Sequence, residues 1–395
     1  MNDKHHWQID PSLLFLNHGC FGALPREVAK VQSRLRDMME CDPINFLAPE
    51  RELEQKLDQV RQRLGQFVGA DAENLVFVRN STDGVNAVLQ SMELAAGDEL
   101  IVTNHGYNAC NNVAHFIAEK SAAVVRIAEV DYPIQGADQV LNAVRAQLTS
   151  RTRFLLVDHV TSPTAIVFPV AELIELARGA GVKIMVDGAH ASGMLPLQIE
   201  KLAPDYYTAN HHKWLCAPKA SGFLYVRPEL QGSINPTVIS HPYNTPRPDR
   251  SKFTASFDWN GTHDPTPILA VPAALDFLDS LHPDGVDGVM QSNHNALLTA
   301  RDSLCKEMGI ETPAPDSMLG SMLSLPLPRV QSEQAEALRK TLRSEYRIEV
   351  PVYGGIRDSR GESVGNTLLR VSVQAYNDPS EIEMLINALR ELGAF

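Results

Sequence analysis

Short apolar segments alternate with helical patterns through the first two thirds of the chain, and this alternation limits the fold more than any other feature. A parallel strand reaches its neighbour only through a crossover, which is usually a helix. Strands that alternate with helices therefore predict a mostly parallel sheet, covered by helices on both faces. The predicted strands span residues 74–79, 99–103, 123–127, 154–158, 183–187 and 222–226.

The pattern changes after about residue 265, where a long helical stretch precedes an α+β pattern. Strands are predicted at 322–325 and 368–373. The last helix is predicted to begin at Asp378-Pro379-Ser380-Glu381, which has a capping residue, a proline at the first position and a glutamate after it. We therefore predict an N-terminal arm over residues 1–25, a large α/β domain over 26–264 and a small C-terminal α+β domain over 265–395.

Composition narrows the class of protein. The chain has 395 residues, is 44% apolar and 21% charged, and carries a net charge of −13 without a run of Lys or Arg, so a nucleic-acid partner is not expected. Its five cysteines are scattered and form no C-x-x-C pair, which argues against a disulfide framework. The N-terminus lacks the apolar core of a signal peptide, and no apolar run of about 18 residues is present. We expect a cytoplasmic protein without membrane contact.

Residues 182–226 hold the most informative chemistry. A predicted strand ends at Asp187, and Lys213 follows two histidines in a turn. A buried carboxylate can keep a heteroaromatic nitrogen protonated, and a lysine amine can form a Schiff base with an aldehyde. An aspartate or a lysine alone is seldom catalytic. The two together indicate pyridoxal 5′-phosphate (PLP) chemistry.

The turn after the first predicted strand is a candidate phosphate site. It reads Asn80-Ser81-Thr82-Asp83-Gly84 and starts a helix. Free N–H groups and the helix dipole favour an anion at such an end. Ser81 and Thr82 are the candidate ligands, although an ordinary helix cap has the same residues.

Other ligands are less consistent with the sequence. Asp187, His190, His211 and His212 could be read as metal ligands, but adjacent histidine side chains diverge and no H-x-x-x-H pair supports them. We expect no metal site. The chain also lacks G-x-x-x-x-G-K-[ST] and G-x-G-x-x-G, which disfavours nucleotide triphosphates and NAD(P).

Two motifs resemble those of fold-type I PLP enzymes of aminotransferase class V. They are DGAH at Asp187 to His190, similar to D-x-A-[HQ], and NHHK at Asn210 to Lys213, similar to [SN]-x-H-K. The resemblance runs from LNHGCFGALP at residues 16–25 to the last helix. With YNAC at residues 107–110, DHVTSPT and RVSVQAYN, the chain is most similar to the isopenicillin N epimerase-like group.

The resemblance implies roles for several residues. Lys213 forms the Schiff base and transfers the α-proton, Asp187 faces the pyridine nitrogen, and His190 lies beside the ring. Arg370 binds the substrate α-carboxylate, for which a guanidinium offers two parallel donors, and His18 is a second expected substrate contact. Either His105 or Tyr107 stacks on the cofactor, and the sequence does not distinguish them.

Further contacts are implied by the same resemblance. Ser162 corresponds to a residue that binds the ring hydroxyl, and Asn210 and His212 reach the phosphate. Thr262, in WNGT, matches a segment that contacts the cofactor of the neighbouring subunit. A homodimer with shared active sites is therefore expected.

The reaction itself stays open at this stage. Class V cysteine desulfurases carry a nucleophilic cysteine on a loop before the small-domain arginine, and residues 351–366 contain none, which excludes persulfide formation by that route. Epimerisation, β-elimination and transamination all begin with removal of the α-proton of an amino-acid substrate. We expect an epimerase or racemase, with a C–S lyase or an aminotransferase as the alternative and a non-catalytic binding protein least favoured. Epimerisation also needs a proton donor opposite Lys213, for which Tyr107, His105 and His18 are candidates.

Overall fold

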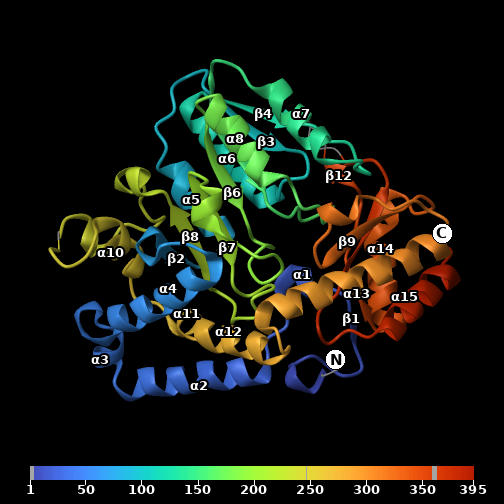
Figure 1. The fold of residues 1–395 in the computed structure, drawn as a ribbon, viewed down its shortest axis with the longest axis horizontal. Helices are drawn as coiled ribbons and strands as arrows, with labels where there is room; N and C mark the ends of the chain where they lie inside the picture. The colour runs from blue at the N-terminus through green and yellow to red at the C-terminus, as the bar shows by residue number, and fades with distance from the viewer. Residues whose placement is uncertain (1–3, 246, 358–362) are drawn as a thin grey trace.

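A seven-stranded sheet forms the centre of the molecule in the computed structural model, which describes residues 4–245, 247–357 and 363–395 (Figure 1). The strand order is β2-β8-β7-β6-β5-β3-β4, and β3 to β7 run parallel while β8 is antiparallel to both neighbours. The predicted α/β class with a mostly parallel sheet is confirmed. The strands are β2 (Leu75–Val78), β3 (Glu99–Thr103), β4 (Val124–Ala128), β5 (Thr152–Asp158), β6 (Lys183–Asp187), β7 (Tyr206–Asn210) and β8 (Gly222–Val226).

Successive strand residues belong to two apolar layers. Leu75 and Phe77 pack in one cluster, and Val76 and Val78 pack in the other. Helices α5 (Ser81–Gln90) and α6 (Asn108–Ser121) cover one face, while α7 (Ala137–Gln147) and α8 (Val170–Gly179) cover the opposite face. Burial on both faces explains why these strands read as continuous apolar runs.

Two elements differ from the prediction. Strand β7 was not predicted, because its sequence YYTAN is polar at its end, yet all five of its residues are buried. Apolar residues at helical spacing over residues 49–68 predict one helix there. In the structure α4 (Glu54–Val68) begins later, because the separate turn Pro49–Leu53 is broken at Arg51 with φ −106° and ψ −106°.

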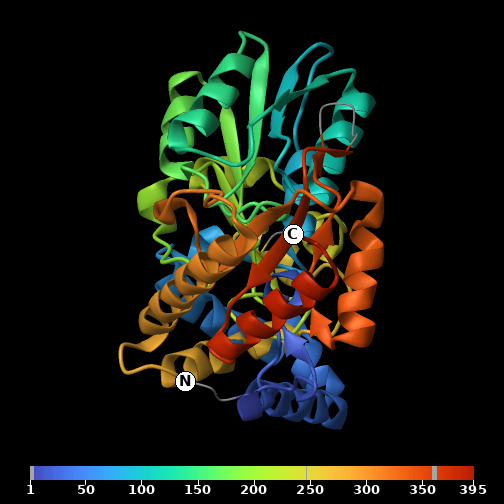
Figure 2. The ribbon, with the colours of Figure 1, turned by 90° about the vertical axis from the view of Figure 1, so that its right-hand side faces the viewer.

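A three-stranded antiparallel sheet lies in the C-terminal part, in the order β11 (Val352–Tyr353), β14 (Thr367–Ser372), β9 (Met322–Leu327). Helices α13 (Gly285–Met308), α14 (Ala335–Glu345) and α15 (Pro379–Glu391) accompany it (Figure 2). As predicted, Asp378 and Glu381 form a capping box at the start of α15. Other short elements are α3 (Pro43–Leu47), α9 (Ile199–Leu202), α10 (Lys252–Asp258), β12 (Ile356–Arg357) and β13 (Ser363–Val364).

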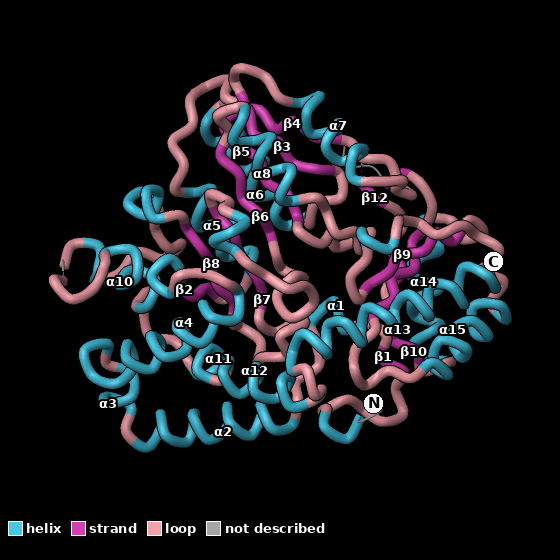
Figure 3. Tube along the Cα trace, in the orientation of Figure 1, coloured by secondary structure: helices cyan, strands magenta, loops and turns pink. Residues whose placement is uncertain are grey.

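The N-terminal residues join both parts of the molecule. Strand β1 (Leu14–Phe15) pairs with β10 (Ile348–Glu349), more than 300 residues away along the chain, since the register joins Leu14 to Ile348. Helix α2 (Arg26–Cys41) packs against α11 (Thr266–Leu269) and α12 (Val271–Ser280), beneath the sheet in Figure 3. Helix α1 (His18–Phe21), which lies between β1 and α2 in the sequence, is close to the centre of the molecule (Figure 1).

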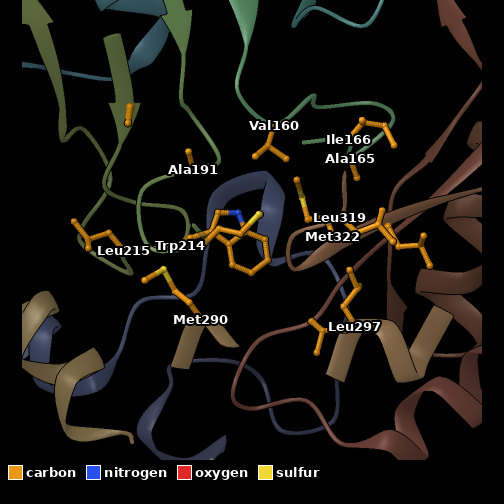
Figure 4. Close-up of a cluster of buried hydrophobic side chains, with 14 of the residues drawn as sticks. Val160, Ala165, Ile166, Ala191, Trp214, Leu215, Met290, Leu297, Leu319 and Met322 are labelled. Carbon is orange, nitrogen blue, oxygen red and sulfur yellow. The ribbon is translucent and has the colours of Figure 1, made fainter. Parts of the chain in front are cut away.

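An apolar cluster connects the Lys213 turn to the C-terminal part. Trp214 and Leu215, which follow the lysine, belong to the same buried cluster as Met290 of α13 and Met322 of β9 (Figure 4). Trp214 and Leu215 are 0% exposed. The turn is therefore held by close packing from two sides.

Within the described ranges, no helix combines the length and the hydropathy that a bilayer crossing requires.

Candidate active site

The carboxyl ends of the parallel strands deliver polar residues to one edge of the sheet, where ligands bind in open α/β folds. Strand β6 ends at Asp187, Lys213 follows β7, and Tyr107 follows β3. A cavity of about 1430 Å³ opens at this edge. It is lined by nine of the predicted site residues, namely Ser81, Thr82, Tyr107, Ser162, Asp187, Asn210, His212, Lys213 and Arg370.

The Lys213 amine is held by His190. The distance from Lys213 Nζ to His190 Nε2 is 3.0 Å, and the Trp214 indole N–H donates to His190 Nδ1 at 3.4 Å. Burial lowers the pKa of His190 well below its usual value, so the ring is neutral. Because Nδ1 accepts from the indole, the ring proton lies on Nε2 and points at the amine. This arrangement favours an unprotonated lysine.

Burial also lowers the pKa of Lys213 itself, to about 8. The Asp187 carboxylate acts in the opposite direction, and the Arg370 guanidinium lowers the pKa further. An amine close to its pKa at neutral pH has the free electron pair that a nucleophile or a base needs.

We expect the rate at which the apoprotein bonds covalently to PLP to rise with pH, with a midpoint near pH 8. The amine loses its proton as the pH passes through its pKa, and only the unprotonated form attacks an aldehyde. Stopped-flow absorbance after mixing apoprotein with PLP measures this rate across the pH range. A midpoint near 10.5, the ordinary value for lysine, would contradict the burial described above.

Asp187 is a buried carboxylate at the cavity wall, 2% exposed. Its Oδ1 accepts from the Ala189 N–H at 2.9 Å, and its Oδ2 accepts from the Cys110 thiol at 3.2 Å. Burial raises the pKa of Asp187. A cation beside the carboxylate has the opposite effect, so a protonated ring nitrogen and the ionised Asp187 stabilise each other.

Asp158 is a second buried carboxylate that the sequence reasoning missed. It ends β5 and is the register partner of Asp187 on β6. Burial, followed by the neighbouring Asp187, raises the pKa of Asp158 well above its usual value. A signal was present, since two predicted strands both end in aspartate and parallel neighbours place such ends side by side.

The start of α5 provides donors for an anion. The Ser81 N–H donates to Asn210 Oδ1 at 2.9 Å, whereas the Thr82 N–H has no partner within the described residues. Gly84 allows the close approach of α5 to β7, because a Cβ there would lie 2.4 Å from Thr208 Oγ1. His212 faces the same cavity, and burial lowers its pKa to about 4. An open helix end with two hydroxyls and a neutral imidazole fits a phosphate.

Arg370 lies on β14 and is 1% exposed. Its Nη1 donates to the Ser162 carbonyl at 2.7 Å and to the Ser162 hydroxyl at 3.2 Å, and its Nη2 donates to the Cys20 sulfur at 3.0 Å. The buried Nε has no partner, and no described carboxylate pairs with this guanidinium. A buried cation without a counter-ion at a cavity wall suits a carboxylate ligand.

Two predicted histidines do not line the cavity. His105 Nδ1 lies 2.7 Å from Thr164 Oγ1 and its Nε2 lies 2.9 Å from the Val130 carbonyl. His18 is likewise fully buried, with Nε2 3.0 Å from the Lys213 carbonyl. Since both rings are 0% exposed and neither lines the cavity, His105 does not fit the role of stacking ring and His18 does not fit the role of substrate contact. Tyr107, 44% exposed, lines the cavity instead.

Other predicted residues occupy different positions around the site. His190 lies behind Lys213 rather than at the cavity wall, and Ser162 lies at the Arg370 side. Thr262 lines a separate surface cleft with Ile44 and Trp259, so it does not reach the cavity of its own chain. Within the ranges that the structure describes, no group of three His, Cys, Asp or Glu side chains could hold a metal ion.

Two further residues at the cavity were also missed. Cys20 lies on α1, and the ring centre of Tyr353 on β11 lies 5.4 Å from the Arg370 guanidinium carbon. Tyr353 belongs to the loop region 351–366 discussed above, of which residues 358–362 lie outside the described residues. No local pattern marks either residue, because Cys20 meets Arg370 by a side-chain contact across 350 residues of sequence and Tyr353 meets it through the pairing of β11 with β14.

Comparisons with known proteins identify the family to which the chain belongs. The family model for aminotransferase class V matches residues 45–385. The isopenicillin N epimerase of Amycolatopsis lactamdurans is 34% identical over 406 residues, which cover 99% of this chain and 98% of that protein. A probable chloroplastic L-cysteine desulfhydrase of Arabidopsis thaliana is 29% identical over 419 residues, covering 98% and 84%.

Solved structures show the same fold. The cystine C–S lyase C-DES, in a mutant form with glycine linked covalently to PLP, superposes with a TM-score of 0.81 at 21% identity over 98% of this chain and 99% of that one. The Escherichia coli cysteine desulfurase CsdA gives a TM-score of 0.79 at 22% identity, covering 98% and 96%. With Lys213, Asp187 and the open end of α5 around one cavity, the residues present fit PLP. The chain belongs to aminotransferase class V and is a PLP-dependent enzyme of fold-type I.

Proposed function

We propose that this enzyme is an epimerase that acts at the amine-bearing α-carbon of an amino acid or a small peptide-like substrate. The observation that carries the proposal is the presence in one cavity of Lys213 and of Arg370, a guanidinium that pairs with no carboxylate among the described residues. The 1430 Å³ of that cavity exceeds the roughly 300–1,000 Å³ of common ligand pockets, which leaves room for a substrate larger than a free amino acid beside the cofactor.

Each polar side chain at the cavity is assigned a separate role in binding or proton transfer. PLP, when bound, supplies an electron-withdrawing ring that accepts the electron pair released at the α-carbon. Arg370 binds the substrate carboxylate through its two-pronged donor edge and fixes the orientation of the α-carbon. The Lys213 amine removes the α-proton, and the Asp187 carboxylate keeps the ring nitrogen protonated. The α5 end, with Ser81 and Thr82, holds the phosphate.

Relatives support both an epimerase and a lyase. The Amycolatopsis and Streptomyces clavuligerus relatives, at 34% and 31% identity, are isopenicillin N epimerases. The relatives named L-cysteine desulfhydrase favour β-elimination at sulfur as the second candidate, and this reaction shares the first proton transfer with epimerisation.

The test is to incubate the holoenzyme in deuterium oxide with isopenicillin N and, separately, with L-cysteine. An epimerase inverts the amine-bearing α-carbon of isopenicillin N and places deuterium there, which chiral chromatography and NMR detect. Release of pyruvate and sulfide from L-cysteine, without inversion of either compound, would establish the lyase instead. Loss of the amine to form a 2-oxo acid would establish an aminotransferase.

We also propose a homodimer with shared active sites. Thr262 faces a surface cleft of about 540 Å³ together with Ile44, a large apolar side chain that is 64% exposed. Exposed apolar residues around a cleft are typical of protein interfaces. A second copy seated on this surface would receive the Thr262 hydroxyl at its own phosphate site.

Mixing Lys213→Ala subunits with Thr262→Ala subunits is therefore expected to restore activity. Random exchange makes half of the dimers hybrids, in which one site has both lesions and the other has neither, so about a quarter of the wild-type activity should return. In the matched control, Lys213→Ala subunits are mixed with Asp187→Asn subunits. Both residues serve the site of their own chain, so each site of a hybrid dimer keeps one lesion and no activity should return. Full activity of unmixed Thr262→Ala, or a monomer that turns over substrate in sedimentation experiments, would contradict the shared site.

A further inference from the structure

Epimerisation requires two proton-transfer groups, one on each face of the α-carbon. We propose that the hydroxyl of Tyr107 is the group opposite Lys213, so that this tyrosine is a catalytic residue as well as the ring that covers the cofactor. This inference rests on the proposed epimerase function.

The strand order places Tyr107 and Lys213 on opposite sides of the site. Lys213 follows β7 and Tyr107 follows β3, while β6 and β5, with Asp187 and Asp158 at their ends, lie between them. The Tyr107 N–H is 3.4 Å from Asp158 Oδ1, which places the start of α6 against this pair. A ligand whose ring nitrogen meets Asp187 is therefore approached by the amine from one side and by the phenol from the other.

Tyr107 shares its cavity with the two charged residues that are expected to hold the ligand, Asp187 and Arg370. Burial raises the pKa of Tyr107, the negative charge of Asp187 adds to this, and the Arg370 guanidinium lowers it. Asp187, the group for the ring nitrogen, and Arg370, the group for the substrate carboxylate, both line the cavity that Tyr107 lines. The α-carbon of a bound amino acid must lie between these two groups.

The hydroxyl is free to act as an acid. It makes no hydrogen bond to the described residues, and the side chain is 44% exposed at the cavity. A raised pKa keeps the phenol protonated at neutral pH, as a proton donor requires. The other two candidates from the sequence, His105 and His18, are fully buried with their ring nitrogens occupied.

In one inversion the α-carbon loses a proton on one face and gains a proton on the other. The Lys213 nitrogen takes the α-hydrogen as a proton, and the electron pair of the broken C–H bond is held by the bound cofactor. The Tyr107 O–H bond then breaks, and its proton joins that electron pair in a new C–H bond on the opposite face. This leaves an ammonium and a phenolate, which exchange one proton through water in the open cavity. The reverse reaction uses the phenolate as the base.

The test compares Tyr107→Phe, which keeps the ring, with Tyr107→Ala, which removes it. The holoenzymes are incubated in deuterium oxide with isopenicillin N and, separately, with its epimer at the amine-bearing carbon. For Tyr107→Phe we expect inversion to fall by at least about 100-fold. Deuterium should still enter isopenicillin N with retention, through Lys213, but should not enter the epimer, whose α-hydrogen faces the missing hydroxyl.

A binding measurement separates the hydroxyl from the ring. Titration of the apoproteins with PLP should give Tyr107→Phe a dissociation constant within about threefold of wild type, and Tyr107→Ala a value weaker by about tenfold, because only the second variant loses the stacked ring. Tyr346→Phe, which removes a surface phenol bonded to Glu391 at 3.0 Å, is the matched control and should behave like wild type in every assay.

The outcomes separate the inference from the proposed function. Inversion by Tyr107→Phe at the wild-type rate, or deuterium exchange lost equally from both epimers, would overturn the role of Tyr107 and leave the epimerase function standing. If the wild-type enzyme exchanges deuterium but inverts neither compound, the proposed function fails and the proton-donor role of Tyr107 fails with it.

Discussion

Replacing Lys213 with alanine is expected to abolish the visible absorbance of the bound cofactor and to lower turnover by at least about 10⁴-fold, because nucleophile and base are lost together. Lys219 also lines the cavity, but it is not expected to replace Lys213. The nearest lysine along the chain after it, Lys219, donates to the Gly22 carbonyl at 3.2 Å and is held there. The absorption spectrum and the rate of α-proton exchange, measured on one preparation, test this expectation.

Two comparisons make the Lys213→Ala result interpretable. Lys306→Ala removes an exposed lysine near the end of α13 and should leave both readouts unchanged. Circular dichroism of Lys213→Ala shows whether the variant is folded. A folded Lys213→Ala protein that keeps the visible band would assign the cofactor to another lysine.

Asp187→Asn is expected to keep PLP but to lower turnover by about 10³-fold. The amide can still occupy the cavity wall, where its oxygen can accept from the Ala189 N–H as Asp187 Oδ1 does at 2.9 Å. Its NH2 group then takes the place of Oδ2 and faces the Cys110 sulfur, which lies 3.2 Å from Oδ2. It carries no negative charge, however, so it cannot hold the ring nitrogen protonated, and the electron pair at the α-carbon loses its acceptor. Stability should change little, because burial of a neutral amide costs less than burial of a charge.

Cofactor content and rate must be measured on the same Asp187→Asn preparation. Asp158→Asn is the informative comparison, because Asp158 is equally buried beside Asp187 but does not line the cavity. Asp158→Asn should lower turnover much less than Asp187→Asn does. Near wild-type turnover by Asp187→Asn would place the charge that faces the ring elsewhere.

Local sequence patterns predicted most of the sheet, because strands buried on both faces are short apolar runs with helices between them. The strands at 99–103, 183–187 and 222–226 coincide with β3, β6 and β8. Strand β7 was missed because its polar Asn210 end resembles a turn, while its neighbours β6 and β8 make it a strand. The pairing of β1 with β10 depends on contacts more than 300 residues apart, which no local pattern encodes.

The residues of the candidate site were predictable where they lie in a sequence motif or a local structural pattern. Lys213, Asp187 and Arg370 lie in recognisable motifs, and the structure brings them to one cavity. Cys20 meets Arg370 across 350 residues of sequence, so only the folded chain reveals it. His105 and Tyr107 were equivalent in sequence, being aromatic and on one loop. The structure separates them because the His105 ring turns inward to Thr164.

Lys213 is expected to be the residue that carries the cofactor in the cavity at the edge of the sheet. Borohydride reduction of the wild-type holoenzyme followed by peptide mapping tests it directly, since reduction fixes PLP to the lysine that holds it. We expect one pyridoxyl group, on the peptide that contains Lys213. A pyridoxyl group on any other lysine, Lys219 included, or a holoenzyme that cannot be labelled at all, would contradict it.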